Sequence, residues 1–419
     1  MRLTPATIQS PSFLDNAKVR RIFDVFDGAG EETRAVGGAL RNALLGVPVS
    51  DVDFATTATP QTTMDRAKAA GLRPIPTGFE HGTVTVIVEG QPFEITTLRE
   101  DVETDGRRAK VRFGRDFEQD ALRRDFTINA LSCNREGHIF DYADGLADIK
   151  ARRVRFIGDA QQRVREDYLR ILRFFRFHAA YGEGAMDAQA FHAAVLEREG
   201  MHNLSRERIR AELLKLLTAR NSAPTIAIMC GAGLLLPVLA GVAIPARLAR
   251  VIAIEHARGT KADPVLRLIA LGVLVREDAE RLREELRLSN AEAQRALGAA
   301  RALEPLHGCT TPPEPKDLRA LLYQHGPQAM RDALTLAQAE TGVPSRDEIW
   351  NGADAFLATT PKPRLPFSGA DLLARGVEPG RCMGDALKAV EQLWIAADFP
   401  SDAASLAPLL DKALTQRGA

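Results

Sequence analysis

Two glycines and two carboxylates near the N-terminus are the first residues whose types and spacing suggest chemistry. Gly37 and Gly38 follow an expected strand, 33–36, and glycines in that position let the backbone approach a phosphate closely. Asp51 and Asp53 stand two apart on a second expected strand, so both carboxylates would share one face. Such a pair suits Mg²⁺, which fills its other positions with phosphate and water. Alone, D-x-D is more often a solvated strand face, whereas both features together indicate a metal and phosphate site.

Four charged residues extend this site toward a nucleotide. Arg41 could add a charged fork to a bound triphosphate, and Arg123 and Arg124, which begin the run RRDFTINAL, would also meet phosphates. Asp125 could accept a hydrogen bond from a ribose hydroxyl. Taken in isolation, this run also fits a capped helix start with surface arginines.

Asp167 and Arg170 form a pair that could read a base. They are three apart on an expected helix over 163–180 and would share one face. The carboxylate offers acceptors and the guanidinium offers donors, which complements the amino donor and ring-nitrogen acceptor of both cytosine and adenine. The same pair opposes uracil and guanine. In isolation, a surface ion pair is the commoner explanation.

The surrounding pattern predicts an α+β head followed by helices. Strands are expected at 83–88 and 93–98, joined by a turn over 89–92 into a hairpin. A helix over 60–70 is closed by Gly71. After residue 150 strand signals almost vanish, and Ser205 is a candidate N-cap for a helix ending at Leu217. The charged segment 101–119 lacks apolar periodicity and is expected to be a mobile loop.

Composition excludes several classes of protein. The chain has 419 residues, 45% of them hydrophobic and 26% charged, which is ordinary for a globular protein of about three domains. Residues 226–246 form the only long apolar stretch, and glycines and a proline divide it into two expected short buried helices. Four cysteines without a C-x-x-C pair suggest neither zinc nor disulfides, but buried thiols in a reducing cytosol. No HExxH, HD or GxSxG motif supports hydrolytic chemistry.

Basic residues balance the acidic ones, with 55 Lys and Arg against 55 Asp and Glu, so any nucleic-acid surface must be local. Residues 152–220 carry 14 basic residues against 9 acidic ones. Further candidates for phosphate contacts are Arg247, Arg250, Arg258, Lys261 and Arg267. For any one of them, an ordinary solvated helix face is the commoner explanation. Linkers are expected at 310–315 and 359–366, which are rich in proline.

Six motifs resemble those of the class II tRNA nucleotidyltransferases, the family of CCA-adding enzymes and bacterial poly(A) polymerases. In family order they are GGALRNALLG…DVD, HGTVTV, FEITTLR, RRDFTINAL, REDYLRILRFFRF and LSRERIRAELLKLL, and they cover about residues 33–217. Six motifs in order do not arise by chance. Residues 369–394 bear a weaker resemblance to the tail of bacterial members.

The resemblance implies a fold and a division into domains. The fold class is α+β, with a polymerase-β-like nucleotidyltransferase head followed by an elongated all-α neck, body and tail. The expected ranges are 20–150 for the catalytic head, 151–220 for the neck with its base-reading helix, 221–340 for the body and 341–419 for the tail. The segment 101–119 corresponds to a loop that the family needs for the final A.

The resemblance also implies roles for particular residues. Asp51 and Asp53 match the metal-binding carboxylates, and Glu94 matches a third acid. The residues that match nucleotide-binding positions are Gly37, Gly38, Arg41, Arg124, Asp125, Asn129, Asp167 and Arg170. The motif over 205–217 matches one that stabilises the neck. Asn42 departs from the family's usual acid after Arg41, although an amide oxygen can still accept hydrogen bonds.

The implied function is template-independent addition of CCA to the 3′ end of tRNA from CTP and ATP, with release of pyrophosphate. Mg²⁺ is the implied cofactor, the compartment is the cytoplasm, and neither a membrane nor a protein partner is implied. Poly(A) polymerase is the nearest alternative, but the stretch 74–86 lacks the Gly-Arg/Lys-Arg-Phe element of those members. A partial enzyme that adds only CC or only A stays open. A non-catalytic RNA-binding paralogue is disfavoured by the intact site residues.

Overall fold

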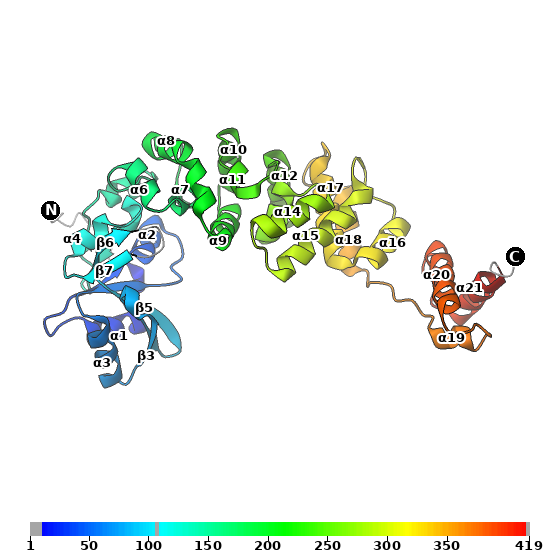
Figure 1. Cartoon of the computed structure of the whole chain (residues 1–419), viewed down its shortest axis with the longest axis horizontal. Helices are drawn as coiled ribbons and strands as arrows, with labels where there is room; N and C mark the ends of the chain where they lie inside the picture. The colour runs from blue at the N-terminus through cyan, green and yellow to red at the C-terminus, as the bar shows by residue number, and fades with distance from the viewer. Residues whose placement is uncertain (1–10, 105–108, 416–419) are drawn as a thin grey trace. The chain divides into compact units, whose positions relative to one another are not determined.

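The computed structural model of the chain describes residues 11–104 and 109–415 (Figure 1). The chain divides into two compact units, one ending at Val238 and the other beginning at Leu239. The first holds a mixed sheet and the helices that follow it, and the second is helical in its described part. The finer division at 150, 220 and 340 stays a prediction.

The sheet of the first unit contains seven described strands in the order β3-β4-β5-β2-β1-β8-β9. Neighbouring strands are antiparallel except β2 and β5, which run parallel. The strands are β1 (Thr33–Val36), β2 (Asp53–Thr56), β3 (Arg73–Gly78), β4 (Thr83–Val88), β5 (Gln91–Thr97), β8 (Ser132–Cys133) and β9 (Ile139–Phe140).

The predicted hairpin is confirmed, with a shorter turn than expected. β4 and β5 pair antiparallel from Thr83–Thr96 to Val88–Gln91, so only Glu89 and Gly90 connect them. Both residues have positive φ, at 47° and 78°. This is the conformation of a type I′ turn, whose twist matches that of the flanking strands.

The segment 101–119 differs from the expected irregular loop. It contains most of an antiparallel hairpin, β6 (Arg99–Thr104) with β7 (Ala109–Phe113), followed by α4 (Phe117–Leu122). Residues 105–108, at the centre of the expected loop, lie outside the described residues. The sequence did not indicate this pairing. Both faces of a two-stranded ribbon can be polar, and its strands then show no alternation of apolar and polar residues.

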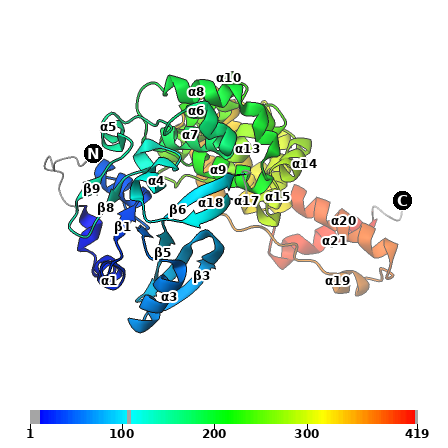
Figure 2. The ribbon, with the colours of Figure 1, turned by 60° about the vertical axis from the view of Figure 1, so that its left-hand side comes forward.

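Helices cover one face of the sheet (Figure 1 and Figure 2). Phe23 of α1 meets Phe54 of β2 edge-on at 5.3 Å between ring centroids, and Phe54 meets Phe93 of β5 at 6.2 Å. The helical elements of this unit are η1 (Ser12–Asp15), α1 (Ala17–Phe26), α2 (Gly38–Leu45), α3 (Pro60–Ala69), η2 (Phe79–His81), α4 (Phe117–Leu122), η3 (Thr127–Asn129), α5 (Gly145–Lys150), α6 (Ala160–Glu166), α7 (Leu169–Tyr181), α8 (Ala188–Leu196), η4 (Arg198–Asn203), α9 (Arg206–Leu217), α10 (Ser222–Gly231) and α11 (Leu236–Leu239).

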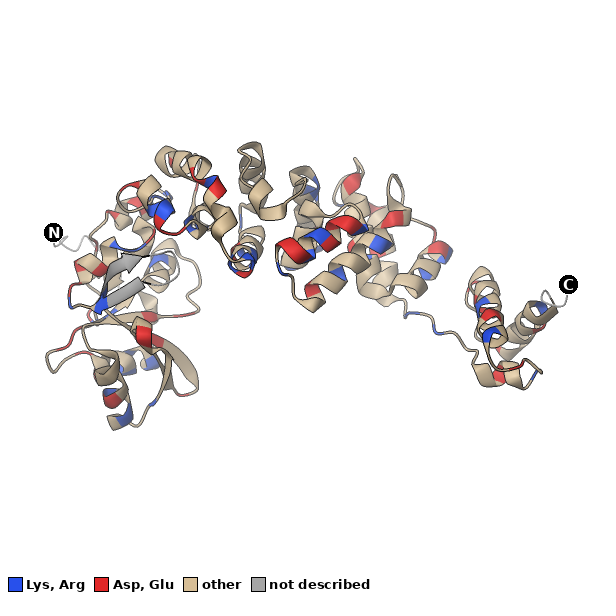
Figure 3. Cartoon of the chain, in the orientation of Figure 1, with Lys and Arg blue, Asp and Glu red and all other residues tan. Residues whose placement is uncertain are grey.

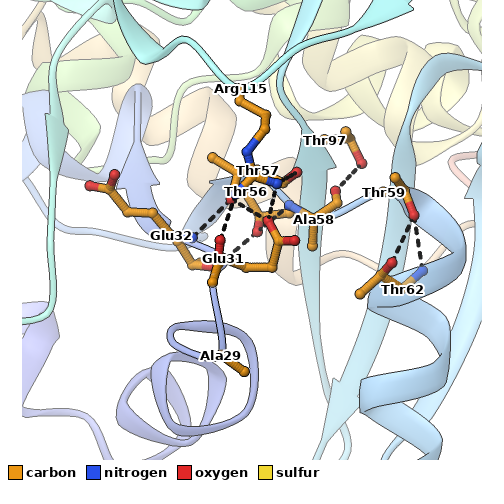
Figure 4. Close-up of polar contacts among 12 residues, drawn as sticks. Ala29, Glu31, Glu32, Thr56, Thr57, Ala58, Thr59, Thr62, Thr97 and Arg115 are labelled. Carbon is orange, nitrogen blue, oxygen red and sulfur yellow. Dashed lines mark hydrogen bonds and ion pairs between the residues drawn. The ribbon is translucent and has the colours of Figure 1, made fainter.

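Polar contacts fasten the segment after β7 to the sheet (Figure 4). The Arg115 guanidinium lies 2.8 Å from Oε2 of Glu31 and donates to the Gly30 carbonyl at 2.5 Å. Glu31 also accepts from the Thr57 hydroxyl at 2.5 Å, and this hydroxyl accepts from the Glu32 N–H at 2.9 Å. The contacts hold the end of β2 that lies away from Asp53.

The second unit consists of packed helices with interspersed charges (Figure 3). A linker was expected over 310–315, but 310–314 belong to a loop between η5 and α16 inside this unit and Pro315 begins α16, whereas 360–368 form a break between α18 and α19. Its helices are α12 (Pro245–Arg258), α13 (Pro264–Gly272), α14 (Arg276–Glu285), α15 (Asn290–Leu303), η5 (Glu304–Leu306), α16 (Pro315–His325), α17 (Pro327–Glu340), α18 (Glu348–Thr359), α19 (Gly369–Leu373), α20 (Arg381–Ala396) and α21 (Ala403–Thr415).

Two expectations about apolar groups are tested here. None of the helices in the described part of the chain has both the length and the apolar character to cross a membrane. None of the four cysteines is in a disulfide, but only Cys133 is buried, and Cys382 is exposed. The expectation of buried thiols was therefore wrong for Cys230, Cys309 and Cys382.

Candidate functional site

A cluster of carboxylates stands at the start of β2. Asp53 is the first residue of this strand, and the register Phe54–Ile95 places it beside Glu94 on β5. Asp51 lies before the strand, because β2 begins two residues later than expected. Surrounding protein desolvates Asp53 and raises its pKa, and the negative charges of Glu94 and Asp51 raise it further. A cation bound beside these three carboxylates would reduce the repulsion between them.

The donor set fits a cation that shares its shell with a substrate. Carboxylate oxygens are hard ligands, and Mg²⁺ is usually held by one or two of them together with substrate phosphates and water. Within the described residues, no group of three or more His, Cys, Asp or Glu side chains is already arranged as a metal site. Glu94 as a third ligand stays a prediction.

The glycine turn brings the backbone against a cationic side chain. Gly37 has φ of 66° and is the N-cap of α2. A Cβ atom added here would lie 3.0 Å from Nη1 of Arg124, so no larger residue fits without displacing this guanidinium. The turn and Arg124 therefore converge at the N-terminus of α2, where amide N–H groups favour anions.

Arg41 is buried and its guanidinium is held on several sides. It donates to the Asn129 amide oxygen at 2.5 Å and to the Tyr181 hydroxyl at 2.8 Å. Asn42, the departure from the family pattern, accepts from Arg41 at 2.9 and 3.2 Å. An amide oxygen thus orients this arginine where the family usually has an acid.

Asp125 connects the RRDFTINAL segment to α7. Oδ2 accepts from Nε of Arg173 at 2.8 Å, and Oδ1 accepts from the Asn129 amide at 3.0 Å and the Phe126 N–H at 2.8 Å. Burial would raise the pKa of this carboxyl, but the Arg173 charge and the three donors outweigh burial and hold the pKa below its usual range. Asp125 is therefore a fixed anion. Its neighbour Arg124 pairs with Asp120 at 3.2 Å.

A cluster of aromatic side chains packs the RRDFTINAL segment against α7. Phe126 packs on Phe156 at 4.9 Å and on Phe177 at 5.1 Å, and Phe156 packs on Phe174 at 5.9 Å. Phe126, Phe156 and Phe174 are fully buried. Because rigid packing sets the distance between the two segments, the polar residues beside Phe126 and along α7 have defined positions.

Asp167 and Arg170 do not lie on one helix as expected. The helix predicted over 163–180 is broken between α6 and α7, and Asp167 has an extended backbone at the break, with φ −156° and ψ 104°. Its Oδ1 accepts from the Leu169 N–H at 3.1 Å, as a residue at a helix N-terminus does. Arg170 pairs with Glu166 at 2.6 Å, so Asp167 and Arg170 have separate partners and do not form the surface ion pair that was the alternative to base reading.

Most of the predicted residues line one cleft of about 460 Å³. Asp51 and Glu94 are outside its lining. Three further residues contribute to it, Arg123, Arg173 and Phe177; Arg123 was one of the two arginines expected to meet phosphates, whereas sequence reasoning had missed the other two. The last two follow Arg170 at helical spacing on α7, and this periodicity could have found them. The predicted lining residues are Gly37, Gly38, Arg41, Asp53, Arg124, Asp125, Asn129, Asp167 and Arg170.

Two candidates for phosphate contacts were wrong. Arg247 is buried, pairs with Glu340 at 2.8 Å and donates to the Ala270 carbonyl at 2.9 Å. Arg267 is buried against Glu255 at 2.7 Å. These guanidiniums bridge helices of the second unit and do not face solvent.

Among the other candidates, Arg258 is partly buried and donates to Gln338 at 2.8 Å and Thr335 at 3.0 Å. Arg250 and Lys261 are exposed. Only these two keep the solvent exposure that a phosphate contact needs.

Comparisons with known proteins agree with this geometry. Residues 33–155 match the family described as "Poly A polymerase head domain", and residues 186–244 match "Probable RNA and SrmB- binding site of polymerase A". The CCA tRNA nucleotidyltransferase 1, mitochondrial, of Mus musculus is 34% identical over 399 residues, covering 92% of this chain and 88% of that protein. The CCA-adding enzyme of Latilactobacillus sakei is 32% identical over 408 residues, covering 96% and 98%.

A solved structure extends the likeness to the whole fold. The crystal structure of the Bacillus stearothermophilus CCA-adding enzyme in complex with CTP is 27% identical, with a TM-score of 0.75, and the match covers 97% of this chain and 99% of that one. The chain therefore belongs to the family of CCA-adding enzymes, the CCA tRNA nucleotidyltransferases.

Proposed function

We propose that this protein adds C, C and A to the 3′ end of tRNA without a nucleic-acid template, using CTP and ATP and releasing pyrophosphate. The observation that carries the proposal is the single cleft, in which a carboxylate of the cluster, a glycine turn, arginines and the Asp167–Arg170 segment converge. Relatives that span nearly the whole chain are named for this activity.

Enzymes of this class generally use a divalent metal, and we propose Mg²⁺, held by Asp51 and Asp53 with Glu94 nearby. When bound, the ion neutralises charge on the triphosphate and lowers the pKa of the attacking 3′-hydroxyl. The raised pKa of Asp53 supports this assignment, since desolvation and then repulsion by Glu94 and Asp51 disfavour its charged form, and a bound cation would offset both.

The cationic residues of the cleft would hold the triphosphate. The Gly37–Gly38 turn leads into the N-terminus of α2, and Arg41 and Arg124 supply charged donors in the same cleft. Asp125 and Asn129 would bind the ribose. Because their side chains are already hydrogen-bonded to Arg173 and Arg41, they are held in place before the nucleotide arrives.

Asp167 and Arg170 would select the base. The Asp167 carboxylate accepts from the exocyclic amino group of cytosine or adenine, and Arg170 donates to the neighbouring ring nitrogen. UTP and GTP present a carbonyl oxygen where the amino group would be, so their entry leaves polar groups mismatched. Such a mismatch costs about 1–3 kcal/mol, which gives roughly tenfold or greater discrimination.

Four cysteines outside disulfides support a reducing compartment, and we propose the cytoplasm. The basic excess of residues 152–220 supports tRNA as the polymeric substrate.

The experiment supplies three tRNA primers, ending before CCA, after C and after CC, with CTP and ATP separately and together. CCA addition predicts C transfer to the first two primers, A transfer to the third and complete CCA ends with both nucleotides. Long A tails on a non-tRNA primer would indicate poly(A) polymerase, and arrest after CC or inability to add C would indicate a partial enzyme. No incorporation at all would indicate a non-catalytic RNA-binding protein.

A further inference from the structure

Side chains of helix α9 contact two residues that line the cleft, Asp167 and Arg173. Arg208 and Glu212 are four apart on this helix and so share one face. Nη2 of Arg208 lies 2.7 Å from Oδ2 of Asp167. Glu212 lies 2.6 Å from Arg176 and 3.7 Å from Arg173. The face of α9 that carries them therefore contacts both the Asp167 break and α7.

Asp167 is held through both carboxylate oxygens. Oδ1 accepts from the Leu169 N–H and Oδ2 accepts from Arg208, so rotation of the carboxylate breaks one contact or the other. Each oxygen has two lone pairs, which leaves acceptor capacity for a base. Arg170 is held separately, by Glu166 at 2.6 Å and by the Arg163 carbonyl at 2.8 Å. Among these contacts, Arg208 is the one made to Asp167 by a side chain of another helix.

We propose that Arg208 is a positioning residue that sets base selectivity by fixing the Asp167 carboxylate in its base-reading orientation. The inference rests on the proposed function, in which Asp167 reads the amino group of cytosine and adenine. A guanidinium at this distance both orients the carboxylate and holds its charge. Without it, the carboxylate can turn away from the cleft, and UTP then meets less opposition.

The pair is too exposed to matter much for folding. The Arg208 side chain is 34% exposed and that of Asp167 is 24% exposed. Ion pairs of this exposure contribute little to stability. Loss of Arg208 is therefore expected to leave the fold intact, and its effect appears in the choice of nucleotide.

The experiment compares Arg208→Gln and Arg208→Lys with a matched control, Arg220→Gln. Arg220 follows the same helix and forms an exposed ion pair with Glu183 at 3.0 Å, so the control removes the same charge without touching Asp167. Values of kcat/KM are measured for CTP and UTP on tRNA lacking CCA, and for ATP and GTP on tRNA ending in CC. Thermal unfolding is measured for every variant.

Arg208→Gln is expected to lower the CTP:UTP and ATP:GTP ratios about tenfold, mainly through slower use of CTP and ATP. Arg208→Lys should recover part of the ratio, because the single contact through Nη2 needs one donor. Arg220→Gln should keep the wild-type ratio. Equal losses for all four nucleotides, or an unchanged ratio in Arg208→Gln, would overturn the proposal.

A double-mutant cycle with Asp167→Ala separates this inference from the proposed function. If Arg208 acts through Asp167, adding Arg208→Gln to Asp167→Ala causes no further loss of selectivity. Additive losses would overturn the positioning role. If Asp167→Ala itself keeps the wild-type selectivity, base reading by Asp167 is wrong. If only Arg208→Gln keeps it, base reading stands and the inference about Arg208 fails.

Discussion

Glu94→Gln distinguishes a carboxylate that serves a metal site from one that only stabilises the sheet. Glu94 neighbours Asp53 across the parallel pair β2–β5 and contributes to its raised pKa. Adjacent strands lie about 4.8 Å apart. Two unit charges about 5 Å apart repel by about 0.8 kcal/mol in water and about 3 kcal/mol at an effective dielectric constant of about 20. Because both residues, although Asp53 is partly desolvated, keep contact with solvent, we take the lower end, about 1 kcal/mol.

The substitution is therefore expected to raise the Tm of the metal-free protein by roughly 2–4 °C. It should also weaken Mg²⁺ binding about fivefold, since the same charge that repels Asp53 attracts the cation. The gain is full above the raised pKa of Asp53, where this side chain is ionised, and disappears as the pH falls and Asp53 takes up a proton.

The assay is thermal unfolding with and without Mg²⁺ at several pH values, because a ligand that binds the folded state raises the Tm with its concentration. Glu80→Gln is the matched control, since Glu80 is an exposed acid of the same sheet region outside the carboxylate cluster. A lower metal-free Tm in Glu94→Gln, or an Mg²⁺-induced shift equal to that of the wild type, would refute the reasoning.

Three further predictions follow from other contacts. Asp125→Asn removes the anion beside Arg173 and should lower the free energy of unfolding, measured by urea titration, by about 3 kcal/mol. Because the pKa of Asp125 is lowered in the folded protein, this contribution to stability is present at neutral pH and is lost in acid. Arg247→Met should lower stability while leaving the salt dependence of tRNA binding unchanged, as the guanidinium is buried. Thiol labelling followed by mass spectrometry should modify exposed Cys382 first, whereas burial raises the pKa of Cys133 to about 12 and should protect it until the protein unfolds.

The head and its glycine turn were predictable because their signals are local. A glycine pair after a strand, two β-branched strands with a short turn, and D-x-D each specify backbone geometry within a few residues. The sequence therefore predicted the elements that carry Gly37, Asp53 and Glu94. The sequence pattern placed Asp51 on β2, although this strand begins at Asp53. The alternation of polar and apolar residues does not indicate where a strand begins.

Contacts between distant segments were not predictable in this way. Arg173 reaches Asp125 across 48 residues, and no spacing rule indicates that pairing. Asp167 was expected inside a continuous helix because the apolar pattern runs through it. The carboxylate instead lies at the break before α7 and accepts a hydrogen bond from the N–H of Leu169, the first residue of that helix. Composition alone could not distinguish Arg247, buried between helices, from exposed Lys261.

The central claim is tested most directly by sequencing the 3′ ends formed when the protein extends tRNA lacking CCA with all four nucleoside triphosphates at equal concentration. The account predicts ends that read CCA and stop there, because the Asp167–Arg170 segment opposes UTP and GTP, and it predicts no extension by Asp53→Ala. Ends containing U or G at the frequency of C and A, A tails without preceding C, or unchanged extension by Asp53→Ala would contradict it.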